Sequence, residues 1–203
     1  MSLFKRLLNP NYKSDKEAAK AKQSDRSKYF PEEHLPIDEK FTYNFKKNGG
    51  KFLYCENIQE VLEAFDNILL ENDWYERKTF CTEPELIKQF DGFNLDFVTD
   101  VNASLFLANC EALVAQNGSI LLSSNQIKEK KLNELPINFI VMAKTSQLVE
   151  NISEGLRIIK GRSKGRIPSN ITTIKDFESK QEKDFMSYGS STKNLYLLLL
   201  EDL

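Results

Sequence analysis

The segment Leu195-Tyr196-Leu197-Leu198-Leu199-Leu200 is a run of consecutive apolar residues near the C-terminal end of the sequence. A strand with one face in water alternates apolar and polar residues, whereas a strand covered on both faces is apolar throughout. The run therefore predicts an inner strand of a sheet that carries further structure on both faces. A chain of 203 residues is long enough to build one such domain.

Strand-like and helix-like segments alternate from about residue 41. A strand is expected at 52–55, and a helix with an apolar stripe follows from 58 to 69, where Asn57 and Glu60 form a capping pattern. A second strand is expected at 78–81. Thr82 and Glu85 repeat the capping pattern before another helix, in which Pro84 occupies the first turn.

The second half of the chain continues this alternation. A helix is expected from about Ser146 to Lys160, starting behind Thr145 and stopping at Gly161. Further strands are expected at 112–115, 120–123, 137–142, 171–174 and 195–200. The pattern predicts an α/β fold, specifically a three-layer α/β/α sandwich with a mostly parallel sheet.

The first 40 residues differ from the rest in composition. Residues 13–28 alternate in charge and lack large apolar side chains, so they cannot offset the entropy of ordering. We expect a flexible N-terminal leader over 1–40 and one domain over 41–203. The apolar residues of 3–8, which flank Lys5 and Arg6, suit either a small amphipathic anchor or a frayed terminus.

Charge and residue counts exclude several classes of function. The formal net charge is −2, which gives no basic field for nucleic acid. No apolar run is long enough for a membrane span or signal peptide, so we expect a cytoplasmic protein. The chain has three cysteines, far apart, and one histidine, His34. We therefore expect no metal site, no cofactor and reduced, buried thiols.

A hairpin is expected at Gln116-Asn117-Gly118-Ser119, between two apolar runs. Asn-Gly is the typical sequence of a type I′ turn, in which both central residues have positive φ. Two interpretations of this region stay open. It is either a turn alone, or a ligand site in which backbone N–H groups and the hydroxyls of Ser119, Ser123 and Ser124 bind a small anion.

The segment from Leu105 to Ser124 resembles the signature of the lactate-utilisation (LUD) family, in which a polar turn ending in Thr-Gly-Ser/Thr joins two apolar strands. The following Leu135-Pro136-Ile137-Asn138-Phe139-Ile140-Val141-Met142 resembles the family's next strand. The resemblance implies a fold similar to ribose-5-phosphate isomerases and CoA transferases. It also implies a place in the oxidation of L-lactate to pyruvate, beside sibling subunits that hold iron–sulfur clusters.

Three departures from the family pattern bear on chemistry. Gln116 stands where related CoA transferases have a nucleophilic glutamate, and an amide cannot form the acyl intermediates. Residues 175–182 lack the family's glycine-rich motif, and 186–190 lack its histidine. We expect a non-redox accessory subunit with iron–sulfur partners. The alternative is a protein of the same fold that binds phosphate, carboxylate or a CoA-type ligand, or a divergent transferase or isomerase.

Overall fold

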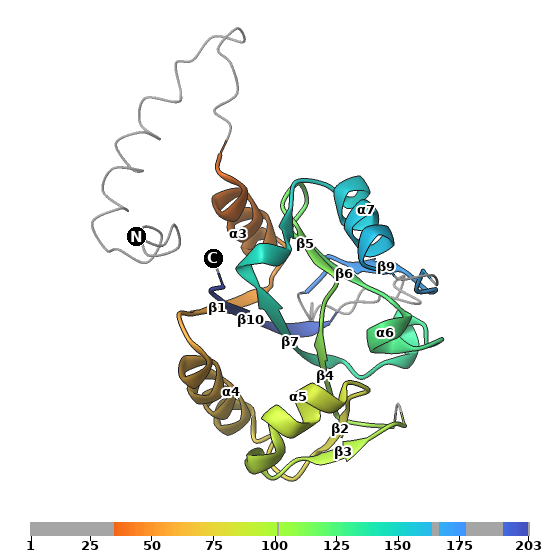
Figure 1. The fold of residues 1–203 in the computed structure, drawn as a ribbon. Helices are drawn as coiled ribbons and strands as arrows, with labels where there is room; N and C mark the ends of the chain where they lie inside the picture. Colours follow the sequence, from red (N-terminus) through yellow and green to blue (C-terminus); the bar gives the residue numbers. More distant parts are fainter. Residues whose placement is uncertain (1–34, 101, 164–166, 178–192, 203) are drawn as a thin grey trace, which may run out of the picture.

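A six-stranded parallel sheet forms the centre of the computed structural model, which describes residues 35–100, 102–163, 167–177 and 193–202 (Figure 1). The strand order is β1-β10-β7-β4-β2-β3, and every neighbouring pair is parallel. The strands are β1 (Lys51–Cys55), β2 (Lys78–Phe80), β3 (Asp96–Val98), β4 (Leu105–Asn109), β7 (Asn138–Lys144) and β10 (Asn194–Leu200). β10 lies between β1 and β7, which confirms the inner strand predicted from its apolar run.

Helices cover one face of this sheet. α4 (Ile58–Asn72) and α5 (Pro84–Gln89) pack their apolar stripes on it, together with the short 3-10 helix η2 (Asp91–Phe93). Phe65 of α4 contacts Phe90 after α5, with ring centroids 4.2 Å apart. The predicted cap of α4 is confirmed, since the Asn57 side chain accepts a hydrogen bond from the Glu60 backbone N–H.

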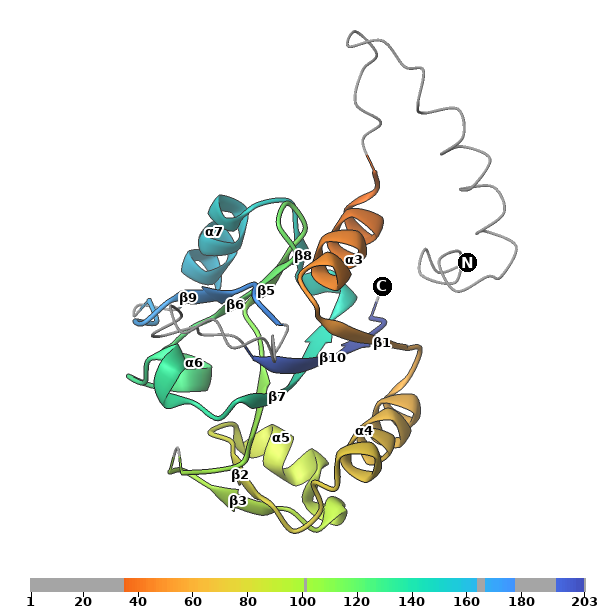
Figure 2. The same cartoon turned by 180° about the vertical axis from the view of Figure 1, so that it is seen from behind.

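The opposite face is covered by α3 (Ile37–Lys47) and by a second, smaller sheet (Figure 2). The order of that sheet is β8-β5-β6-β9, formed by β8 (Leu148–Val149), β5 (Ala112–Val114), β6 (Ser119–Leu122) and β9 (Thr172–Ile174). α7 (Ile152–Arg162) packs on its outer side, and α6 (Ser124–Ile127) follows β6. The predicted three-layer α/β/α architecture with a mostly parallel sheet is confirmed.

Two helix starts differ from the prediction. α7 begins at Ile152 behind Asn151, not behind Thr145, because Leu148 and Val149 first pair with Leu113 and Val114 as strand β8. Gly161 lies inside α7 rather than after it. α5 is preceded by Glu83, while the Thr82 hydroxyl donates to the backbone oxygen of Gln126 over 2.9 Å instead of capping the helix.

The hairpin between β5 and β6 is confirmed, but its predicted turn type is wrong. Gly118 has φ +65°, whereas Asn117 is not among the residues with positive φ. The Gly118 N–H donates to the Val114 carbonyl over 2.9 Å, so four residues connect the paired positions Val114 and Ser119. A type I′ turn would need positive φ at both Asn117 and Gly118.

The N-terminal part of the domain starts earlier than the sequence indicated. α3 begins at Ile37, so the expected boundary between residues 40 and 41 falls inside this helix. Phe41 and Phe45 of α3 are fully buried in the main core. Residues 3–8 and 13–28 lie outside the described residues, as do 186–190 and most of 175–182.

Among the helices in the described part of the chain, none combines the length and apolarity needed to cross a membrane.

Candidate functional site

The direction of the chain connections changes between β2 and β4. From β2 the chain passes through α5 on one face of the sheet to reach β3. From β4 it passes through the second sheet and α6 on the other face to reach β7. In a parallel α/β sheet, two neighbouring strands whose connections leave in opposite directions have a crevice outside their carboxyl ends, and ligands bind there.

Glu83 stands at this point, three residues after β2. Its carboxylate accepts two hydrogen bonds from Asn109 at the end of β4, one from the backbone N–H over 2.8 Å and one from the side-chain amide over 3.1 Å. Burial raises the pKa of Glu83, and the charge of Glu111 raises it further, while the Asn109 hydrogen bonds and the Lys128 charge oppose the shift. Glu83 is thus a half-buried carboxyl group with a raised pKa.

Glu111 follows β4 and contacts the start of α6. The same oxygen, Oε1, accepts hydrogen bonds from the Ser123 hydroxyl over 2.6 Å and from the Asn125 amide over 2.8 Å. Ser123 is the N-cap of α6, and its backbone N–H donates to Gln126 Oε1 over 2.9 Å in a capping box. The hydroxyl and amide hold Glu111 in place, where its charge acts on Glu83.

Cys110 lies between the two strand-end residues Asn109 and Glu111. Its thiol is buried, and burial raises its pKa far above the usual range, with smaller contributions from the charges of Glu111 and Glu83. The Cys110 carbonyl accepts a hydrogen bond from the Gln147 amide over 2.5 Å. Cys110 is therefore a neutral packing residue under the site, rather than a thiolate.

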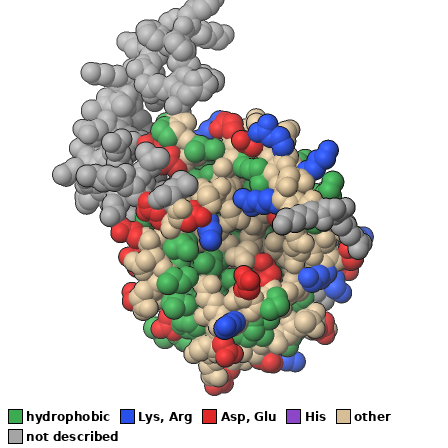
Figure 3. All heavy atoms as spheres, in the orientation of Figure 1, with side chains coloured by type: hydrophobic (Ala, Val, Ile, Leu, Met, Phe, Trp, Pro, Cys, Tyr) green, Lys and Arg blue, Asp and Glu red, His purple; other side chains and the backbone are tan. Residues whose placement is uncertain are grey.

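A shallow pocket of about 340 Å³ adjoins this cluster through Asn125. It is lined by Ser124, Asn125, Lys128, Glu129, Ile167, Pro168 and Ser169. Acidic side chains gather near the middle of the face drawn in Figure 3, and elsewhere on that face acidic and basic side chains are interspersed. A small polar molecule in the pocket would meet Asn125, whose amide donates to Glu111, and the charged side chains of Lys128 and Glu129.

The predicted ligand residues fall into two groups at opposite ends of β6. Gln116, Asn117 and Gly118 form the hairpin turn. Its carbonyls accept hydrogen bonds from the Asn44 amide of α3, to Gln116 over 3.2 Å, and from the Asn48 amide directly after α3, to Asn117 over 2.7 Å. Ser119 is fully buried, and its hydroxyl donates to Asn117 Oδ1 over 2.7 Å. This end of β6 is a contact between the hairpin and α3.

The other group lies at the β2/β4 edge. Ser123 contacts Glu111, and Ser124 lines the pocket. The sequence analysis did not identify Glu83, Asn109 or Glu111 as site residues. The signal that could have identified these three residues is their position, since each stands at or just after the end of a strand. The sequence alone does not show that those strands are neighbours.

The three cysteines do not come together. Cys55, Cys81 and Cys110 are all buried and free, and burial raises the pKa of Cys55 and of Cys81 to about 11. Across the described ranges of the chain, no three His, Cys, Asp or Glu side chains are grouped so as to hold a metal ion.

Comparison with known proteins gives the family of this chain. A crystal structure of a DUF162 family protein from Deinococcus radiodurans aligns with a TM-score of 0.55 and 14% identity, over 82% of this chain and 96% of that one, and so shares the fold. No curated protein sequence matches. The family model for the LUD domain matches residues 99–200, just over half of the sequence. The chain therefore belongs to the LUD domain family.

Proposed function

We propose that this LUD-domain protein binds a small hydroxylated carboxylic acid or sugar derivative at the β2/β4 edge, as a cytoplasmic accessory subunit of a lactate-oxidising system. The observation that carries the proposal is the pair Glu83 and Glu111 at the point where the chain connections diverge: the charge of Glu111 acts on Glu83, and each carboxylate is held by its own hydrogen bonds. Family membership supports the link to lactate, and the geometry supports the ligand class.

The chemistry of the pair limits the ligand. An ionised carboxylate only accepts hydrogen bonds, so Glu83 and Glu111 favour a ligand that presents hydroxyl donors. A bare anion would be repelled by two carboxylates. Lys128, whose charge is felt at Glu83, offers a counter-charge for a carboxylate or phosphate on the same ligand. In this proposal Ser123 and Ser124 belong to the site, and residues 116–119 support the fold.

The cysteines support an accessory role. A four-iron cluster takes about four thiolates, whereas this sequence has three cysteines, all buried in separate places. We propose that electron transfer belongs to partner subunits with iron–sulfur clusters. Isolation of the tagged protein from its native cell tests this part, with iron and acid-labile sulfide expected in the co-purified material. Isolation without such a partner, together with normal growth on lactate after deletion, would contradict it.

A ligand screen tests the site separately. Lactate, pyruvate, sugar phosphates and CoA esters are added to the purified chain, and the melting temperature is measured, because a ligand that binds only the folded state raises it. We expect a hydroxylated compound to give a shift that Glu83→Gln and Glu111→Gln reduce. Asp96→Asn, an exposed carboxylate at the start of β3, serves as the control and should keep the full shift. A shift that both site variants retain would contradict the assignment.

A second candidate function follows from the pKa of Glu83. A carboxyl group with a raised pKa beside a second carboxylate can exchange a proton with a ligand, as in general acid–base catalysis by isomerases. Incubation of the bound compound in D2O, followed by NMR, would show deuterium at a ligand carbon that depends on Glu83. Binding without exchange would favour the accessory role alone.

A further inference from the structure

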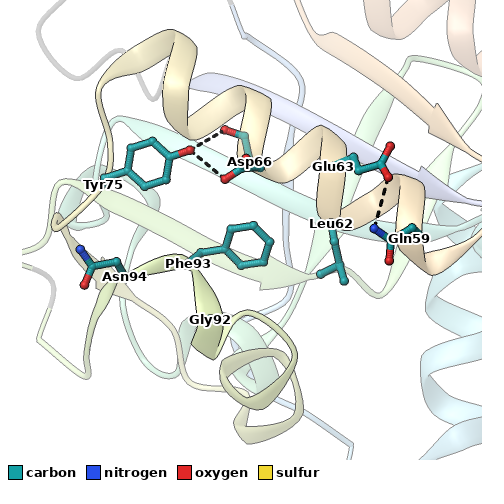
Figure 4. A pocket seen from close by; sticks show the side chains of 8 residues that line it. All are labelled: Gln59, Leu62, Glu63, Asp66, Tyr75, Gly92, Phe93 and Asn94. Atoms are coloured by element: carbon teal, nitrogen blue, oxygen red, sulfur yellow. Dashed lines mark hydrogen bonds between the residues drawn. The ribbon is translucent and has the colours of Figure 1, made fainter.

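A second hollow lies on the other side of the molecule's parallel sheet, between α4 and η2 (Figure 4). It has a volume of about 410 Å³ and is open to solvent. Leu62 from α4 and Phe93 from η2 face each other across it, and Tyr75 closes one end. We call this hollow the α4 groove. Its apolar side chains can accommodate an apolar side chain or the aliphatic stem of a lysine or arginine.

The α4 wall of the groove is acidic. Glu63 and Asp66 stand on it, both exposed, and the Tyr75 hydroxyl donates to Asp66 Oδ1 over 2.7 Å. The α4 sequence contains four carboxylates, Glu60, Glu63, Asp66 and Glu71, and no lysine or arginine. Among the described residues that line the groove there is no basic side chain. The negative charge of this wall is therefore not neutralised from within the groove.

Apolar side chains extend the surface beyond the groove along α4. Ile58, Leu62, Asp66 and Leu70 follow one another at a spacing of four residues, which places them on one side of the helix. Ile58 is 46% exposed and Leu70 is 69% exposed. Hydrophobic side chains also gather on the surface around α4 and α5 in the space-filling view (Figure 3). The surface is thus longer than the groove and combines apolar side chains with carboxylates.

We infer that the α4 groove and the row from Ile58 to Leu70 bind a basic amphipathic segment of a partner protein. Apolar residues of the segment would cover Leu62, Phe93 and Leu70, while its lysines or arginines pair with Glu63 and Asp66. An arginine can also stack on the Phe93 or Tyr75 ring. Charge complementarity selects this partner, because an acidic or purely apolar segment would leave the α4 carboxylates unpaired. This inference is independent of the ligand site at the β2/β4 edge.

The test uses two fluorescently labelled amphipathic peptides with the same leucines. One carries arginine and lysine at its polar positions, and the other carries glutamate at the same positions. We expect the basic peptide to bind the full chain saturably by fluorescence anisotropy, more weakly as salt increases, and the acidic peptide not to bind. The double substitution Glu63→Gln and Asp66→Asn should weaken binding about fivefold or more, since each exposed ion pair contributes a few-fold.

Glu85→Gln is the matched control, because Glu85 is an exposed carboxylate on α5 outside the groove lining. It should leave the affinity unchanged. Hydrogen exchange should show protection within residues 58–75 and 92–94 when the basic peptide is bound. Equal binding of both peptides, equal loss in the double variant and the control, or protection elsewhere would overturn the inference. So would a change in oligomeric state caused by the double variant without peptide, which would assign the groove to a second copy.

Discussion

Gly118 determines how closely the hairpin can approach α3. An added Cβ at this position would lie 2.4 Å from the Asn44 carbonyl carbon and 2.4 Å from the Phe45 backbone nitrogen, and φ is +65°. We predict that Gly118→Ala lowers the free energy of unfolding by about 2 to 5 kcal/mol, from left-handed strain and overpacking against backbone. Urea unfolding measures this. Gly92→Ala, where an added Cβ meets nothing within 4 Å, should change stability by less than about 0.5 kcal/mol.

Glu83 should make stability depend on pH in a definite direction. Because burial and the Glu111 charge raise its pKa in the folded state, the folded protein holds this proton more tightly than the unfolded chain. The stabilisation from protonated Glu83 is complete below the pKa that Glu83 has in the unfolded chain. It is lost as the pH rises through the raised pKa of Glu83 in the folded protein. Glu83→Gln removes this titration. The stability of the variant relative to wild type should therefore increase as the pH rises from about 4 through the raised pKa of Glu83.

The measurement is urea unfolding of both proteins at several pH values. The same series with Glu85→Gln should give no such trend, because Glu85 is an exposed carboxylate on α5 and its substitution leaves Glu83 unchanged. A constant difference between wild type and Glu83→Gln across the pH range would show that Glu83 titrates alike in the folded and unfolded states.

The candidate site was only partly predictable from its residues. Ser123 and Ser124 were recognised because they follow the LUD-like hairpin, although the hairpin turn itself proved to contact α3. Glu83 was not singled out, although it lies between Thr82 and Pro84 at a predicted helix start. Its partner Asn109 is 26 residues away, and their contact depends on β2 pairing with β4, which no local pattern encodes.

At the level of the elements, local patterns located most strands and the helix α4. The second sheet explains why the start of α7 was predicted wrongly. The predicted helix included residues 146–149, but the Val149 carbonyl accepts a hydrogen bond from the Ala115 N–H and Val149 pairs in β8, so α7 starts only at Ile152. The pattern Asn151 and Glu154 repeats the capping signal of Asn57 and Glu60, and the Asn151 side chain accepts from the Glu154 N–H. Helix α3 and strands β3, β4 and β8 were not predicted.

The revised end of α7 gives a prediction for this element. Gly161 lies within the helix, and an added Cβ would meet nothing within 4 Å. Gly161→Ala should raise the free energy of unfolding by about 0.5 to 1 kcal/mol, because alanine is the better helix former. Thermal or urea unfolding would show the gain. A loss of stability instead would indicate a left-handed residue at a helix end, as the sequence alone suggested.

For the whole molecule, α3 is part of the domain rather than of the leader. Phe41 and Phe45 are fully buried, and Phe45 also contacts Phe177 with ring centroids 4.8 Å apart. A chain that begins at residue 35 should keep a single cooperative thermal transition. One that begins at residue 49 should lose it, since removing two core phenylalanines costs about 3 to 5 kcal/mol each, comparable with the stability of a domain. Circular dichroism distinguishes the two outcomes, and a cooperative transition in the shorter chain would mean that α3 is not needed for folding.

Each of the two sheets positions a different part of the proposed ligand site. The large parallel sheet brings the ends of β2 and β4 together, and the small sheet positions α6 so that Ser123 and Asn125 reach Glu111. The proposed ligand site therefore requires both layers, whereas the α4 groove depends only on the helical layer of the opposite face.

NMR mapping of the ligand site tests the central claim most directly. Backbone amide shifts of the full chain are recorded while lactate and sugar phosphates are titrated in turn. The account predicts saturable changes from one hydroxylated compound, centred on residues 82–83, 109–111 and 123–128, and much smaller changes in Glu111→Gln. Changes centred on the hairpin at 116–119, or no saturable change with any compound, would contradict a ligand site between β2 and β4.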